Sequence, residues 1–295
     1  MTKQSFDTPG AVQVRVENRV GAVRVFTHPG PLTEVEVAPT GAAADELVGR
    51  TRVAHRDLGG HHVVEVEVPG WGGLWRSALR GPAEVQVTVR APEGASLDVT
   101  TASGSVSAEG SLGSTRVVTA SGSVTVGPVA SDLDARSASG SVTVASVTGQ
   151  ADIATSSGSV HCGTLAGEAS VKTASGSVAV QAARRRLTVQ TASGDVLAGE
   201  LGDGCNIQTV SGDQRVERLV AGRARFKTVS GDLTLRVARG SGVGVDAESV
   251  SGSLSSEIDL SSHEAAMGPA EDGSPHVDLR ARTVSGNVRI ERAQA

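Results

Sequence analysis

The chain has 295 residues and a formal net charge of −5, with 37 glycines, no tyrosine, three phenylalanines and two tryptophans. A globular enzyme core normally contains more aromatic side chains, whereas small and β-branched residues suit the thin interior of a repeat protein. The acidic balance, without a broad basic field, argues against nucleic acid as a partner.

The first 95 residues predict a β-rich cap. Alternating valines on both sides of Gly21 predict two short strands, at Val14–Val16 and Val23–Val25. Later in this segment we predict strands at 34–37, 50–55, 62–68 and 84–90, a helical or loop stretch at 41–47, and a hairpin turn at 57–60. Because an exposed sheet end invites association, we expect residues 1–95 to cover one end of a stacked β structure.

A segment at 69–82 contains both tryptophans of the chain. The favoured interpretation is a loop that folds its tryptophans back onto the cap. The alternative is an exposed apolar patch that contacts a partner protein of unknown identity or an anionic membrane surface. The candidate contact residues are Trp71, Leu74, Trp75 and Arg76.

From residue 101 to 213 a six-residue phrase, TASGSV in its commonest form, recurs every 18 residues. Such a strict period indicates a repeat architecture in which each unit stacks on its neighbours. Three further copies of the phrase follow at wider spacing. The repeat glycines are Gly104, Gly122, Gly140, Gly158, Gly176, Gly194 and Gly212, followed by Gly231, Gly252 and Gly286.

Each period contains two short segments of alternating apolar residues. Small or apolar side chains stand seven, five and three positions before the glycine, and again two and four positions after it. This predicts two strands per coil, stacked about 4.8 Å apart in parallel sheets, with the glycine at a corner that needs a positive φ or a close backbone approach. We therefore predict an all-β fold, a β-solenoid over residues 96–295, right-handed like most parallel crossovers.

The C-terminal part departs from the strict period. The last interval contains an excess segment, residues 261–278, which we expect to form an irregular excursion. The strand Val288–Ile290 should then rejoin the sheet and form the C-terminal end, which the excursion and the charged tail would cover. We expect a capped particle, a monomer or small homo-oligomer, and not an open filament.

The two cysteines are expected to be buried free thiols. Cys162 and Cys205 occupy inward positions three coils apart, about 14 Å at the strand spacing, which is too far for a disulfide. The start of the chain lacks the apolar run of a secretory signal, and no stretch is apolar enough to span a bilayer. We therefore expect a cytoplasmic protein.

Few residues suggest chemistry, and we expect no cofactor. Asp195, Asp213 and Asp232 share one column on adjacent coils, where stacked carboxylates would suit calcium, although the neighbouring Arg215 would also neutralise them. A hairpin at His55 and 61–62 could hold a metal, but a polar turn is the favoured interpretation. No phosphate-binding loop, zinc spacing or nucleophile motif is found.

The repeated T-x-S-G-[SD]-V phrase, the approach APEGASLDVTTASGSV and the opening VGAVRV resemble an uncharacterised bacterial β-strand-repeat family labelled "putative adhesin". The resemblance covers nearly the whole chain. It implies a β-solenoid and offers no catalytic residues to carry over.

We interpret the chain as a non-enzymatic scaffold or protein-interaction module, a rigid β-solenoid. One alternative is a polymerising cytoskeletal β-helix with the architecture of the bactofilins. Another is a carbohydrate-active β-helix enzyme, which would need outward carboxylates and aromatic platforms on one face. The outward positions here are mainly Ser, Thr, Arg and Gln, which disfavours that enzyme.

Overall fold

The computed structural model describes residues 1–41, 44–70, 84–258 and 275–294. The chain divides into two compact units, Met1–Thr148 and Gly149–Ala295, called unit 1 and unit 2 below. Within the described residues, no helix has the length and apolar character needed to cross a membrane. The segment 71–82, with Trp71, Leu74, Trp75 and Arg76, and most of the excursion lie outside the described residues.

Unit 1 is built from strands and one short helix. Its elements are β1 (Thr2–Asp7), β2 (Ala11–Asn18), β3 (Val23–His28), β4 (Leu32–Thr40), α1 (Ala44–Arg50), β5 (Arg52–Asp57), β6 (His61–Val68), β7 (Glu84–Pro92), β8 (Ser96–Thr101), β9 (Val106–Glu109), β10 (Thr115–Thr119), β11 (Val124–Val129), β12 (Leu133–Ser137) and β13 (Val142–Val147).

Two sheets run through unit 1. One has the order β1-β4-β7-β3-β9-β11-β13, and the other β5-β6-β2-β8-β10-β12. Residues 18 apart lie opposite each other, so that Val117 pairs with both Val99 and Ala135. The two strands predicted on either side of Gly21 are found as β2 and β3, which pair in parallel with β8 and β9 and so form a coil of the same kind.

The other strands of the first 95 residues surround this first coil. β6 and β7 pair in parallel with β2 and β3, while β5, β4 and β1 add antiparallel neighbours at the edges. Leu47 and Val48 of α1 are buried. The hairpin and the strand at 84–90 are thus found as predicted. The stretch predicted as helix or loop at 41–47 contains the start of α1, which continues to Arg50, and the domain boundary at residue 95 stays a prediction.

Unit 2 repeats the same plan. Its strands are β14 (Ala151–Thr155), β15 (Val160–Leu165), β16 (Ala169–Ser175), β17 (Val178–Ala183), β18 (Leu187–Ser193), β19 (Val196–Leu201), β20 (Cys205–Ser211), β21 (Gln214–Leu219), β22 (Gly222–Lys227), β23 (Leu233–Val237), β24 (Gly242–Ser251), β25 (Leu254–Ser256), β26 (His276–Ser285) and β27 (Val288–Arg292).

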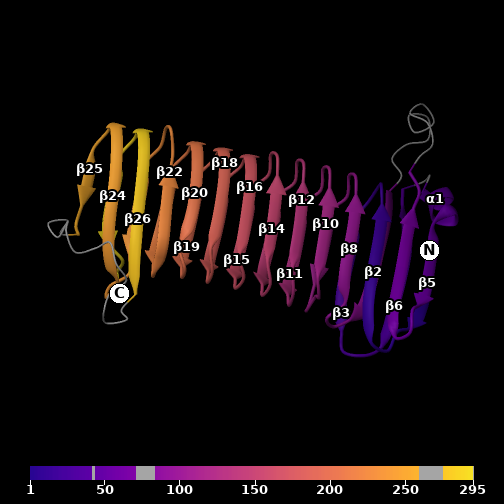
Figure 1. The fold of residues 1–295 in the computed structure, drawn as a ribbon. Helices are drawn as coiled ribbons and strands as arrows, with labels where there is room; N and C mark the ends of the chain where they lie inside the picture. Colours follow the sequence, from indigo (N-terminus) through magenta and orange to yellow (C-terminus); the bar gives the residue numbers. More distant parts are fainter. Residues whose placement is uncertain (42–43, 71–83, 259–274, 295) are drawn as a thin grey trace. The chain divides into compact units, whose positions relative to one another are not determined.

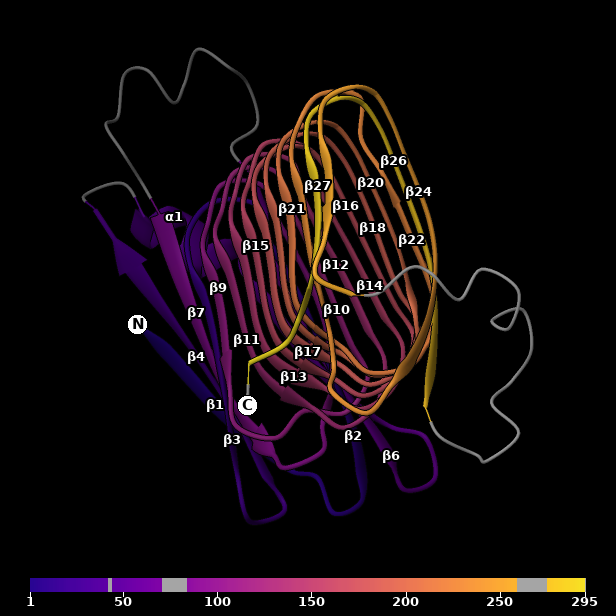
Figure 2. The same ribbon diagram turned by 90° about the vertical axis from the view of Figure 1, so that its left-hand side faces the viewer.

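The strands of unit 2 form two facing layers, which Figure 2 shows from the side of β24 and β27. One layer runs β14-β16-β18-β20-β22-β26-β24, and the other β15-β17-β19-β21-β23-β27-β25. Inward residues such as Val171, Val189 and Ile207 are fully buried and lie opposite one another on successive strands. The predicted β-solenoid is confirmed.

The order of the last two coils corrects our expectation for the C-terminal end. β26 lies between β22 and β24 (Figure 1). In the other layer β27 lies between β23 and β25. The strand at Val288–Ile290 is therefore not terminal, and the earlier segment 242–256 forms the outermost coil. The excursion also ends sooner than predicted, because His276, Val277 and Asp278 already belong to β26.

The repeat glycines mainly allow the backbones of successive coils to approach each other closely. A Cβ atom added to Gly122 would lie 1.8 Å from the carbonyl oxygen of Gly104, and one added to Gly140 would lie 1.8 Å from that of Gly122. A positive φ, the other role expected at the corner, occurs at fewer of these glycines. They are Gly194, Gly212, Gly231 and Gly286.

The corners of the two units differ in their hydrogen bonds. In unit 1 the N–H of Gly122 donates to the Thr119 hydroxyl of its own turn, at 3.1 Å. In unit 2 the N–H of Gly194 donates instead to the carbonyl of Ser211 on the next coil, at 3.0 Å. At these corners the backbone bonding therefore continues to the glycine, and β16, β18 and β20 reach two residues further than β10, whereas β14, the first strand of unit 2, ends like β10 three residues before its glycine.

Candidate interaction surface

Four exposed valines form a row along one corner of unit 2, which we call the valine ridge. Each stands two residues before a repeat glycine, where the other coils carry alanine or serine. They belong to neighbouring coils, in the order of β20, β22, β26 and β24. Their exposed fractions are 52% for Val210, 44% for Val229, 48% for Val284 and 76% for Val250.

The exposure of Val210 follows from the extended strand at this corner. β20 continues to Ser211, so alternation turns Thr209 inward and Val210 outward. The backbones of successive coils are bonded here: the Ser230 N–H donates to the Val210 carbonyl and the Ser285 N–H to the Val229 carbonyl, both at 2.9 Å. The ridge is thus continuous, with its side chains spaced by about 5 Å.

A column of carboxylates lies three residues beyond the ridge. The structure brings Asp195, Asp213 and Asp232 onto adjacent coils, as predicted from the sequence. An oxygen of Asp195 accepts the Asp213 N–H at 2.9 Å, Asp213 accepts the Asp232 N–H at 2.8 Å, and Asp232 accepts the Asn287 N–H at 2.7 Å. Each carboxylate thereby accepts a hydrogen bond from the backbone of the next coil, so the column has a structural role.

No cluster of three or more metal-ligating side chains forms among the residues that the structure describes. The rings of His55 and His62 instead bond each other, with 3.1 Å between Nε2 and Nδ1, and His62 Nε2 lies 3.1 Å from the Pro9 carbonyl oxygen. Both cysteines are free and buried, and burial raises the pKa of each thiol to about 12. Neither thiol is therefore a ready nucleophile.

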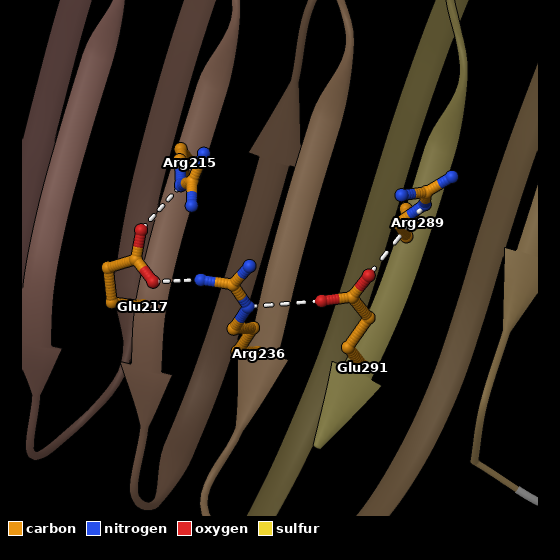
Figure 3. A network of polar contacts seen from close by, with 5 residues as sticks. All are labelled: Arg215, Glu217, Arg236, Arg289 and Glu291. Carbon is orange, nitrogen blue, oxygen red and sulfur yellow. Dashed lines mark hydrogen bonds and ion pairs between the residues drawn. The ribbon is translucent and has the colours of Figure 1, made fainter. Parts of the chain in front are cut away.

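An ion-pair network crosses three strands at the C-terminal end of unit 2 (Figure 3). Glu217 on β21 bonds both Arg215 and Arg236, and Arg236 on β23 donates to Glu291 on β27 at 3.0 Å. Arg289 lies 3.8 Å from the other oxygen of Glu291. The network ties the inserted strand β27 to β23.

The network changes the acidity of its members. Desolvation raises the pKa of Glu217, but the hydrogen bond from Arg215 and the charge of Arg236 outweigh it, and the pKa ends below the ordinary 4.5. The hydrogen bond to Glu291 raises the pKa of Arg236 above its usual value. All of these side chains are at least partly exposed, so the network contributes modestly to stability.

Sequence reasoning missed the valine ridge. The signal was present, since the phrase changes from TASG to TVSG at Val210 and keeps valine in the later copies. Our interpretation used the glycine and the alternating positions before and after it. It gave no role to the residue two positions before the glycine. The candidate contacts Trp71, Leu74, Trp75 and Arg76 stay a prediction, because they lie outside the described residues.

Comparison with known proteins identifies the family. The family model described as Toastrack DUF4097 matches residues 70–218 and 197–291. No functionally curated protein matches the chain.

Solved structures of low similarity include a "putative adhesin" from Parabacteroides distasonis, with 11% identity, a TM-score of 0.45 and coverage of 98% of this chain and 96% of that one. Another "putative adhesin", from Bacteroides fragilis, has 13% identity, a TM-score of 0.40 and the same coverage. A "putative cell adhesion protein" from Clostridium sporogenes has 8% identity, a TM-score of 0.26 and 99% coverage of both chains. Since its model matches more than half of the sequence, the chain belongs to the Toastrack DUF4097 family.

Proposed function

We propose that this chain is a non-enzymatic protein-interaction module whose valine ridge binds another protein. The observation that carries the proposal is the exposure of Val210, Val229, Val284 and Val250 on four neighbouring coils. Single exposed apolar residues are common on protein surfaces, but a contiguous row is a feature of interaction sites.

The fold supports this role by making the ridge rigid. Backbone bonds join Val210 and Val229 to the next coil, and Thr209 and Thr283 beside the ridge are buried. A surface that is ordered before binding loses little conformational entropy when the partner docks. The flanking Asp195, Asp213 and Asp232 add an acidic border, which would favour a partner with basic residues beside an apolar strip.

Substitution of the ridge valines by alanine tests this proposal. The four ridge valines are changed together to alanine, the residue that TASG coils carry at this position, so that folding is preserved. Wild-type and variant chains are used for affinity capture from cells that naturally express the protein, with Arg185→Gln as a surface control. A partner lost only with the four-alanine variant supports the proposal. A partner retained equally by all three chains contradicts it.

The segment with Trp71 and Trp75 is a second candidate contact. Deletion of residues 71–82, tested in the same capture, separates its contribution from that of the ridge. If only the deletion removes the partner, the interaction belongs to that segment and not to the ridge.

A further inference from the structure

Of the strands that the structure describes, those of the outermost coil of unit 2 lie at an unpaired sheet edge. Among the described residues, the ten-residue strand β24 pairs with β26 alone, and β25 pairs with β27 alone. Every second N–H and carbonyl of β24 therefore points away from its sheet. Such an edge is a template for another strand.

The inner face of this coil is only partly covered. A hollow of about 290 Å³ opens between its two strands, with Val245, Ala247 and Leu254 in its walls and Val288 and Ile290 beneath. Leu254 is 52% exposed, whereas Ile290, one coil further in, is 2% exposed. Burying these aliphatic groups would stabilise an association.

Unit 1 has a complementary edge at β5. Among the described residues this strand pairs only with β6. Its inward side chains Val53 and His55 are half-buried, and the half-buried Phe6 ring lies 5.1 Å from the His55 ring. The β5 edge thus presents an apolar and aromatic group, which the hollow beside β24 could receive.

The two edges carry opposite charges on their outward faces. β24 presents Asp246 and Glu248, and β5 presents Arg52 and Arg56. Glu248 pairs with Arg282 of its own sheet and Arg56 with Glu65. Within the part of the chain that the structure describes, neither Asp246 nor Arg52 has an ion-pair partner.

These charges decide which edges can pair. Two β24 edges would gather Asp and Glu, and two β5 edges would gather Arg, and like charges on facing strands are destabilising. An antiparallel pair of β5 with the β24 of a second copy sets Arg52 opposite Asp246. The same register sets Val53 opposite Val245 on the inner face.

We propose that copies of this chain associate head to tail, the β24 edge of one copy pairing with the β5 edge of the next. The contact joins two different surfaces, so it is heterologous and can continue from copy to copy. In this register β5 lies opposite residues 241–246, so that Val250, the ridge residue on β24, lies outside the paired segment. This association differs from the capped particle expected from the sequence. That expectation placed the strand Val288–Ile290 at the C-terminal end, whereas β27 lies inside its sheet.

Cysteine trapping tests the pairing directly. Arg52→Cys and Asp246→Cys chains are purified separately, then oxidised alone and mixed. The native Cys162 and Cys205 are buried and stay unreactive. We expect a disulfide-linked dimer of the two chains only in the mixture. A dimer from either chain alone, or none in the mixture, overturns the proposed pairing.

Charge reversal supplies an independent measurement in solution. In sedimentation equilibrium the average mass of the wild-type chain should rise with concentration. Arg52→Glu or Asp246→Lys should each weaken association by about tenfold, and a chain with both changes should regain most of the loss. Arg185→Glu, an exposed change elsewhere, should have no effect.

A constant single-chain mass at all concentrations would contradict the proposal. So would a double variant that associates as weakly as the single variants. A ridge variant with only Val210, Val229 and Val284 changed to alanine leaves β24 intact and should self-associate like wild type, so failure of this inference and failure of the proposed function are distinguishable.

Discussion

At the scale of single residues, the corner glycines determine how closely successive coils stack. At Gly140 the constraint is the carbonyl oxygen of Gly122, which would lie 1.8 Å from an added Cβ atom. The φ angle of Gly140 is not positive, so backbone strain is not the reason for this glycine. The neighbouring Ser139 is exposed and has room for any side chain.

Replacing Gly140 by alanine should therefore lower the free energy of unfolding by about 1–3 kcal/mol, because the backbone must move to admit the methyl group. Ser139→Ala should change it by less than about 0.5 kcal/mol. Urea titration of both variants measures the difference. Equal midpoints would show that the corner tolerates a Cβ atom.

The Glu217 carboxylate makes stability depend on pH. Its pKa in the folded chain lies below the ordinary 4.5, so folding favours the charged form. This contribution is present above pH 4.5 and is lost as the pH falls through the folded-state pKa. Glu217→Gln should be less stable than wild type at neutral pH and should match it in acid.

Urea midpoints at neutral pH and well below pH 4.5 check this expectation. Glu200→Gln, at a carboxylate that is 59% exposed, is the control and should show little change at either pH. A destabilisation of the Glu217 variant that persists in acid would point to lost packing and not to lost charge.

At the scale of elements, each strand has one face between the sheets and one in solvent. Val189 is fully buried on β18, and the next residue, Gln190, is exposed. An aspartate at the first position would be an unpaired charge in an apolar interior. An aspartate in place of Gln190 would be exposed to water.

Val189→Asp should thus cost about 3–5 kcal/mol or prevent folding, while Gln190→Asp should be nearly neutral. Melting temperatures from circular dichroism compare the two variants. Similar values would mean that the inward register of this strand is wrong.

The sequence alone was sufficient for most of these elements. The 18-residue period fixed which residues face inward, because a one-residue slip would expose every core position. It could not fix the order of the last coils, since the segments 242–256 and 276–292 carry the same alternation and the same V-S-G corner. Their order depends on three-dimensional contacts such as Arg236 with Glu291, which no spacing rule contains.

At the scale of the whole molecule, space order and chain order differ in both units. In unit 1 the early strands β2 and β3 lie inside β6 and β7, and in unit 2 the late strands β26 and β27 lie inside β24 and β25. In each case the segment nearer the chain end is paired on both sides. In unit 1 the outer strands β6 and β7 have further neighbours in β5 and β4, whereas in unit 2 each outer strand, β24 and β25, has one neighbour among the described residues.

Hydrogen exchange should reveal this difference in unit 2. The amides of β26 donate within a sheet on both sides, whereas half of those in β24 point away from it. We expect peptides from β24 to exchange much faster than peptides from β26 in dilute solution, where no second copy protects the edge. Equal protection of the two strands in dilute solution would contradict the described order.

The inserted position of β26 and β27 has a consequence for biosynthesis. These strands leave the ribosome after β24 and β25, yet β26 lies between β22 and β24, and β27 lies between β23 and β25. Until they emerge, the outermost coil has no proper neighbour, and it must wait or bind provisionally to β22 and β23. A nascent chain that has reached only Ser256 therefore lacks the strands that join the outermost coil to the rest of unit 2, and unit 2 is complete only after residue 292 has been made.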